Sequence, residues 1–117
     1  MRPGLSRLLN RELAVYRAQT TDDGHGGQTT VMQMQGTVRA KVDQPSPTER
    51  MVAASTSSRH SHNVYLSSRT FVRRGDELRG ADALGTVQRF RVLSVVQPSA
   101  PVYSKALAEL IQTEGGT

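Results

Sequence analysis

The 117-residue sequence contains no cysteine and no tryptophan, and its aromatic residues are three tyrosines and two phenylalanines. Without cysteine the chain has neither disulfides nor thiolate metal ligands, so packing must hold the fold. The core must be built mainly from Val, Leu, Ala and Met, and we expect one small domain with a stability near the lower end of roughly 5–15 kcal/mol. No run approaches the ~18 apolar residues of a membrane-spanning helix, so we expect no membrane partner.

Lysine and acidic residues are also scarce. Only Lys41 and Lys105 are lysines, so arginine supplies nearly all of the positive charge behind the formal net charge of +5. Arginine binds phosphate and carboxylate through a planar fork and is enriched in interface cores. The balance suits a nucleic acid or an acidic protein surface, and equally a soluble protein from a genome that favours arginine codons.

Motifs for catalysis, cofactors and metals are missing. His60 and His62, two residues apart, would lie on one face of a strand, but spacing supplies no third metal ligand, and we interpret both as solvated. The Asp22-Asp23-Gly24 run lacks the length and terminal glutamate of a calcium loop. No phosphate-binding loop, dinucleotide fingerprint or Gly-x-Ser-x-Gly motif occurs. We therefore expect no enzyme, no cofactor and no metal site.

Alternating apolar residues between turn signals predict an all-β fold, a small antiparallel barrel or sandwich of about six strands. The segment at 105–113 favours a helix by propensity but alternates like a strand, and the all-β context favours the strand. We expect an N-terminal arm at 1–10, a barrel domain at 11–113 and a flexible tail at 114–117. The expected strands lie at 11–19, 28–34, 37–43, 62–68, 88–96 and 105–113, with a further small one possible at 77–79.

Residues 44–62 form an unusually long connection between the third and fourth expected strands, 37–43 and 62–68. Ordinary connections span about 4–6 residues, and longer ones are usually functional or disordered. Ser46-Pro47-Thr48-Glu49 is a capping-box pattern with proline at the first helical position, so a short helix of about two turns at 47–54 is plausible. Glu49 is the only acid in the connection. We expect this segment to be presented to a partner.

Basic residues also cluster around this connection. They are Arg50, Arg59, His60, Arg69, Arg73 and Arg74. Because few aromatic side chains are available for base stacking, any contact with DNA would be to phosphates and without sequence preference. One alternative function is therefore a standalone basic β-barrel that binds nucleic acid. A solvated basic face explains the same cluster equally well.

The order of these features resembles the head–tail joining proteins of tailed bacteriophages, also called head-closure or stopper proteins, over residues 11–115. Met32 and Met34 stand where that family often has tryptophan, and its Arg-x-x-Tyr-x-Ile segment appears as Arg89-Phe90-Arg91-Val92. The matching segments are Leu13-Ala14-Val15-Tyr16-Arg17, Asp22 to Gly27, Val38 to Val42, Pro45 with Glu49, His62 to Leu66, Arg89 to Val95 and Leu107 to Leu110.

The resemblance implies a structural virion protein at the head–tail interface, assembled in the bacterial host cytoplasm; a gene transfer agent is equally consistent. It implies a ring, expected to be a dodecamer, beneath portal and adaptor proteins and above tail proteins, with packaged double-stranded DNA in its channel. The expected channel-gating residues are Glu49, Arg50, Met51, Ser55, Ser57, Arg59 and His60. The expected partner contacts are Leu5, Leu8, Leu9, Asp23, His25, Arg73 and Arg74.

Overall fold

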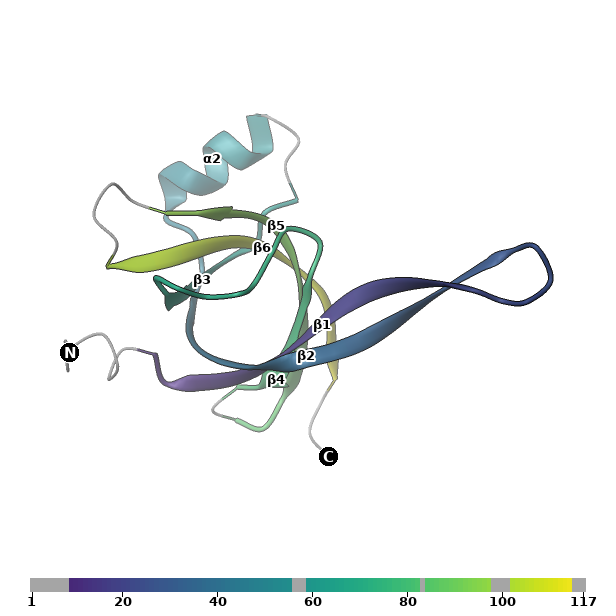
Figure 1. Ribbon diagram of the computed structural model, residues 1–117. Helices are drawn as coiled ribbons and strands as arrows, with labels where there is room; N and C mark the ends of the chain where they lie inside the picture. The colour runs from purple at the N-terminus through teal and green to yellow at the C-terminus, as the bar shows by residue number, and fades with distance from the viewer. Residues whose placement is uncertain (1–8, 56–58, 83, 98–101, 115–117) are drawn as a thin grey trace.

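The chain forms a closed barrel of six antiparallel strands, with one short helix beside one end (Figure 1). The computed structural model describes residues 9–55, 59–82, 84–97 and 102–114. The order around the barrel is β1-β2-β3-β6-β5-β4. The elements are β1 (Arg11–Asp22), β2 (Gln28–Asp43), α2 (Pro47–Ser55), β3 (His62–Ser67), β4 (Glu77–Ala81), β5 (Val87–Val96) and β6 (Tyr103–Glu114). The prediction of a small all-β barrel is confirmed.

The inward-facing residues of every strand form one apolar core, as the alternation predicts. Phe90 is its largest member and is fully buried, and Val92 is almost fully buried two residues further along β5. A fully buried side chain of this kind contributes roughly 1.5–3 kcal/mol. The remaining core members are Leu13, Val15, Ala40, Val64, Leu66, Val72, Leu78, Ala106 and Ala108.

The segment 105–113 is a strand, as its alternation and the all-β context favoured. β6 pairs with β3 on one side and with β5 on the other, so it closes the barrel. Ala106 and Ala108 are fully buried in the core. A helix here would leave both neighbouring strands with unpaired edges, which explains why the tertiary context overrides helix propensity.

One strand assignment was wrong, although the number of strands was not. The segments 28–34 and 37–43, expected as two strands, are one continuous strand, β2, so the helix lies between β2 and β3 and not between a third and a fourth strand. Gly36 does not end the strand because it adopts a φ of 146°, which accommodates an irregularity, and the register with β1 shifts between Val15 and Tyr16. Such a bulge bends a strand while its pairing continues.

The bulge also marks where the β1–β2 hairpin leaves the barrel. Beyond it the two strands continue as a twisted ribbon that projects well away from the other strands (Figure 1). We call residues 17–34 the arm. The tip of the arm is the turn that the sequence predicted, and Gly24 and Gly26 adopt positive φ there. Asp23 accepts hydrogen bonds from the backbone N–H groups of His25 and Gly27.

Candidate functional site

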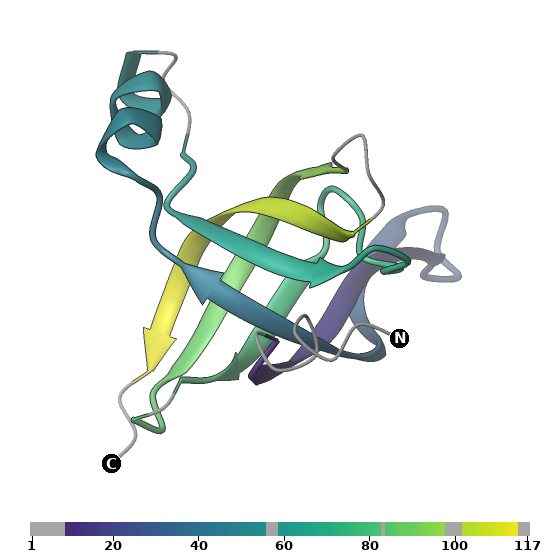
Figure 2. The same cartoon turned by 90° about the vertical axis from the view of Figure 1, so that its left-hand side faces the viewer.

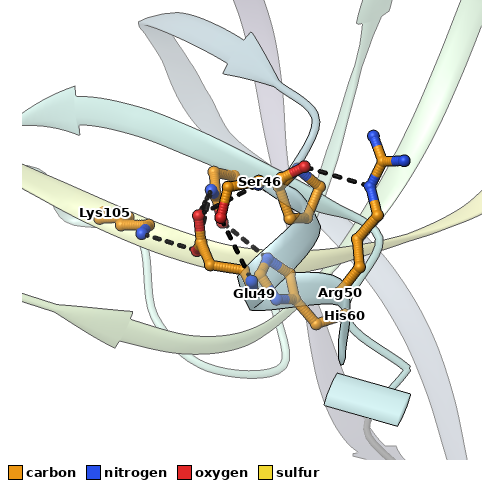
Figure 3. Close-up of polar contacts among 7 residues, drawn as sticks. Ser46, Glu49, Arg50, His60 and Lys105 are labelled. Carbon is orange, nitrogen blue, oxygen red and sulfur yellow. Dashed lines mark hydrogen bonds and ion pairs between the residues drawn. The ribbon is translucent and has the colours of Figure 1, made fainter. Parts of the chain in front are cut away.

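The connection between β2 and β3 contains the predicted helix, and the predicted capping box starts it (Figure 3). Ser46 Oγ accepts a hydrogen bond from the backbone N–H of Glu49 at 3.2 Å, and Glu49 Oε1 accepts one from the backbone N–H of Ser46 at 3.3 Å. Pro47 occupies the first helical position, where its missing N–H costs nothing. Two amide groups that would otherwise lack helical partners are thereby satisfied.

The Glu49 carboxylate also fixes the helix to the barrel. Its Oε2 accepts hydrogen bonds from Lys105 Nζ of β6 at 3.1 Å and from Asn63 Nδ2 of β3 at 3.3 Å. The hydrogen bond from Lys105, with those from the Ser46 backbone and Asn63, lowers the pKa of Glu49 to about 2. The carboxylate therefore stays charged throughout the physiological range and joins the helix to two strands.

Arg50 holds the start of the same segment. Its Nε donates to the carbonyl of Pro45 at 3.1 Å (Figure 3). Its Nη2 donates to Oε1 of Gln44 at 2.9 Å. The guanidinium thus closes the turn between β2 and α2. The predicted gating residues Glu49 and Arg50 therefore have a structural role at the base of the helix.

Hydrogen bonds also fix the C-terminal end of the connection, just before β3, to the barrel. Nε2 of His60 donates to Oδ1 of Asn63 at 2.6 Å. Ser61 bonds to β6 through both its backbone and its side chain. Its backbone N–H donates to the carbonyl of Ala108 at 2.9 Å, and its Oγ accepts from the backbone N–H of Leu110 at 2.7 Å and donates to the carbonyl of Ala108 at 3.5 Å. Both ends of the 44–62 connection are therefore anchored on the barrel.

Between these anchors the helix lies beyond one end of the barrel (Figure 2). Met51 is 73% exposed and Val52 is 58% exposed, although both are apolar. Ser55 and Arg59 are exposed too, while Ser57 lies outside the described residues. Met51 and Val52 therefore form a small exposed apolar surface on an anchored helix.

The two histidines do not form a pair on one strand face. The ring of His62 packs edge-on against Phe90 with 5.1 Å between ring centroids, whereas the ring of His60 bonds Asn63. Burial, together with the charge of Arg11, lowers the pKa of His62. Both histidines are half-buried, so the prediction that they are solvated was wrong. Within the described residues, no group of three or more His, Cys, Asp or Glu side chains could hold a metal ion.

The predicted partner-contact residues lie in separate places. Asp23 and His25 are exposed at the arm tip, and Arg73 and Arg74 are exposed in the loop before β4. Leu9 packs against its own barrel and is 6% exposed. Leu5 and Leu8 lie outside the described residues.

Sequence reasoning missed the acid–arginine contacts that surround the arm's base. Arg17 binds Asp76, with Nε to Oδ1 and Nη2 to Oδ2 both at 2.9 Å, and Asp76 is almost completely buried. Glu77 is 5% exposed and bonds to Arg79 and Arg89. Burial would raise the pKa of Glu77, but the hydrogen bonds from Arg89 and Arg79 outweigh burial and lower it. Glu77 and Arg79 lie in the same strand, β4, but Arg17 with Asp76 and Glu77 with Arg89 join residues 59 and 12 positions apart, which no local motif reveals.

Comparison with known proteins places this architecture in a family. A family model described as phage head completion protein matches residues 6–106. The chain belongs to the phage head completion protein family. Membership indicates a structural role in the phage head, in a family that is not typically enzymatic, and locates the protein at the head–tail region of the virion. The resemblance noted in the sequence is confirmed at this level.

A solved structure has the same fold. The solution structure of protein SF1141 from Shigella flexneri 2a superposes with a TM-score of 0.73 at 15% sequence identity, covering 95% of this chain and 97% of that one. At this identity the likeness concerns the fold alone. No curated protein matches the chain. Among the described residues, the helix is too short to cross a membrane.

Proposed function

We propose that this chain closes the phage head as a subunit of a ring, in which residues 44–62 obstruct the DNA channel. Membership of the head completion family supports the head-closure role. The observation that carries the gating role is the anchored helix, because Glu49, Arg50 and Ser61 fix both ends of the segment while Met51 and Val52 remain exposed. Because the anchors fix the helix on its barrel, all subunits of the ring would hold their helices at the same position along the ring axis.

The ring, expected to be a dodecamer, lies beneath portal and adaptor proteins and receives the tail on its other face. In the channel of the ring, weak contacts between the helices of neighbouring subunits are repeated in every copy and together form a barrier to the exit of DNA. Contact with DNA is to phosphates and without sequence preference. The domain boundaries remain a prediction, with residues 1–10 as an N-terminal arm toward neighbouring proteins, 11–113 as the barrel and 114–117 as a tail, of which Glu114 is still the last residue of β6.

The charge distribution favours this proposal over a standalone nucleic-acid-binding barrel. Arg17, Arg79, Arg89 and Arg91 are paired with acids of their own barrel. Of the exposed cations of the basic span, Arg59 lies before β3, whereas Arg69, Arg73 and Arg74 lie together in the connection between β3 and β4. A salt-dependent DNA titration separates the two functions: micromolar, salt-sensitive binding by an isolated monomer would favour the nucleic-acid binder.

The gating role is tested by replacing residues 51–59 with a Gly/Ser linker of equal length. This change removes the exposed helix surface and keeps the anchors at Glu49, Arg50 and Ser61. We expect particles that package DNA and then lose it. The matched control is Leu84→Ser, in an exposed turn at a residue that is 89% exposed, and it should retain DNA. Full retention with normal tail joining in the linker variant would show that the gate lies elsewhere.

A further inference from the structure

The arm has an apolar face whose methionines its own barrel does not cover, although Arg79 lies over the ring of Tyr16 at the root of this face, 3.9 Å from the ring centroid. Met34 lies opposite Tyr16 and Met32 lies opposite Ala18, so these four side chains share one face of the ribbon. Met34 is 53% exposed and Met32 is 38% exposed. Methionine packs adaptably against apolar surfaces and is enriched in protein interfaces.

Beyond Arg17, which binds Asp76, the arm receives little support from the rest of the fold. β1 pairs with β4 through Ala14–Tyr16, just before the arm, and β2 pairs with β3 through Lys41–Asp43, after the arm. Neither pairing includes a residue of the arm. A two-stranded ribbon is marginally stable in water by itself. Contact with another surface would therefore stabilise the arm and remove its methionines from water.

A groove beside the root of the arm offers such a surface. It has a volume of about 380 Å³ and is lined by the apolar side chains of Leu9, Val38 and Phe71, with Arg39 and Arg69 among its polar lining. Phe71 is 43% exposed. The groove begins on β2 a few residues after the arm ends, and β2 runs through both as one strand. The arm of the same chain therefore cannot fold back into it.

The arm and the groove have opposite charge. Within the arm, residues 17–34, the charged residues are Asp22, Asp23 and Arg17, and Arg17 is paired with Asp76 of its own barrel. The described residues that line the groove include Arg39 and Arg69 and no acid. Complementary charge of this kind steers association and fixes its orientation.

We propose that the arm of one copy docks its methionine face in the Leu9–Val38–Phe71 groove of the next copy. The contact joins two different surfaces of the chain, so it propagates head to tail and makes a ring if the rotation between copies closes. This inference names the contact between subunits and rests on the proposed ring.

Cross-linking tests the contact directly, because the chain has no cysteine of its own. Met34→Cys and Ser67→Cys proteins are mixed and treated with a short bismaleimide, which avoids the strict geometry of a disulfide. Ser67 is an exposed member of the groove lining. We expect heterodimers to form at least tenfold faster than in a control mixture of Met34→Cys with Thr48→Cys, an exposed residue of α2. Equal rates in the two mixtures would overturn the proposal.

A variant that adds positive charge to the methionine face separates this inference from the proposed function. Met32→Lys/Met34→Lys should keep the circular dichroism and melting temperature of the parent but fail to assemble rings on particles, because Arg39 and Arg69 of the groove repel the new charges, while Leu84→Lys assembles normally. If the double variant forms rings as well as the parent, the arm contact is wrong and the ring still stands. If arm and groove cross-link but particles lacking the protein still retain DNA and join tails, the proposed function is wrong and the contact stands.

Discussion

The anchor between Glu49 and Lys105 makes a quantitative prediction for Glu49→Gln. Between the ordinary value of 4.5 and about 2, the lowered pKa of Glu49 corresponds to at most roughly 3 kcal/mol at 1.36 kcal/mol per pKa unit. The side chain of Glu49 is 37% exposed and that of Lys105 is 25% exposed, so solvent screens the pair. We expect the substitution to lower the free energy of unfolding at pH 7 by about 1 kcal/mol, or roughly 3–5 °C in melting temperature.

The pH dependence gives the sign of the effect. Because the pKa of Glu49 is lower in the folded chain, its stabilisation is complete above the ordinary value of 4.5 and is lost as the pH falls through about 2. Thermal melts of the parent and of Glu49→Gln should therefore differ at pH 7 and converge near pH 2.

Two controls isolate the carboxylate. Glu12→Gln, at an exposed position of β1, should change stability by less than about 0.5 kcal/mol. A double-mutant cycle with Lys105→Met should show coupling between the two positions. An unchanged melting temperature at pH 7, or a difference that persists undiminished at pH 2, would refute the argument that this charged contact anchors the helix.

Three further substitutions test the barrel and the root of the arm. Phe90→Ala should lower the free energy of unfolding by about 3–5 kcal/mol in denaturant titrations, because it empties the centre of the core; a loss below 1 kcal/mol would contradict this packing. Asp76→Ala leaves Arg17 without its carboxylate partner and should cost about 3 kcal/mol in the same assay, whereas an equal stability would mean that water replaces the pair. Gly36→Val should cost about 1–3 kcal/mol by thermal melting, since φ is 146° and a Cβ would lie 3.3 Å from the ring of Phe71; a neutral result would show that the bulge tolerates a side chain.

The barrel was predictable because its signals are local. Alternation along β5 identified Phe90 and Val92 as core, and the Ser46–Glu49 pattern identified the helix start, since a capping box needs only four consecutive residues. The continuity of β2 was not predictable in the same way. Gly36 is compatible with both a strand end and a bulge, and only pairing with β1 decides between them.

The arm shows a second limit of sequence patterns. Met32 and Met34 alternate with polar residues just as Val38 and Ala40 do, so both pairs predict a strand with one buried face. Ala40 is fully buried and Met34 is 53% exposed because the barrel ends between them. Periodicity shows which residues share a face, but the other strands determine whether anything covers that face.

The network around α2 explains why the helix was predictable while its attachment was not. One oxygen of Glu49 caps the helix through Ser46, three residues away, and the other accepts from Lys105, which is 56 residues away. The first contact follows from local sequence, and the second exists only because β6 closes the barrel beside β3. A single carboxylate therefore joins helix formation to barrel closure, so the proposed gate can keep its position only in a fully folded subunit.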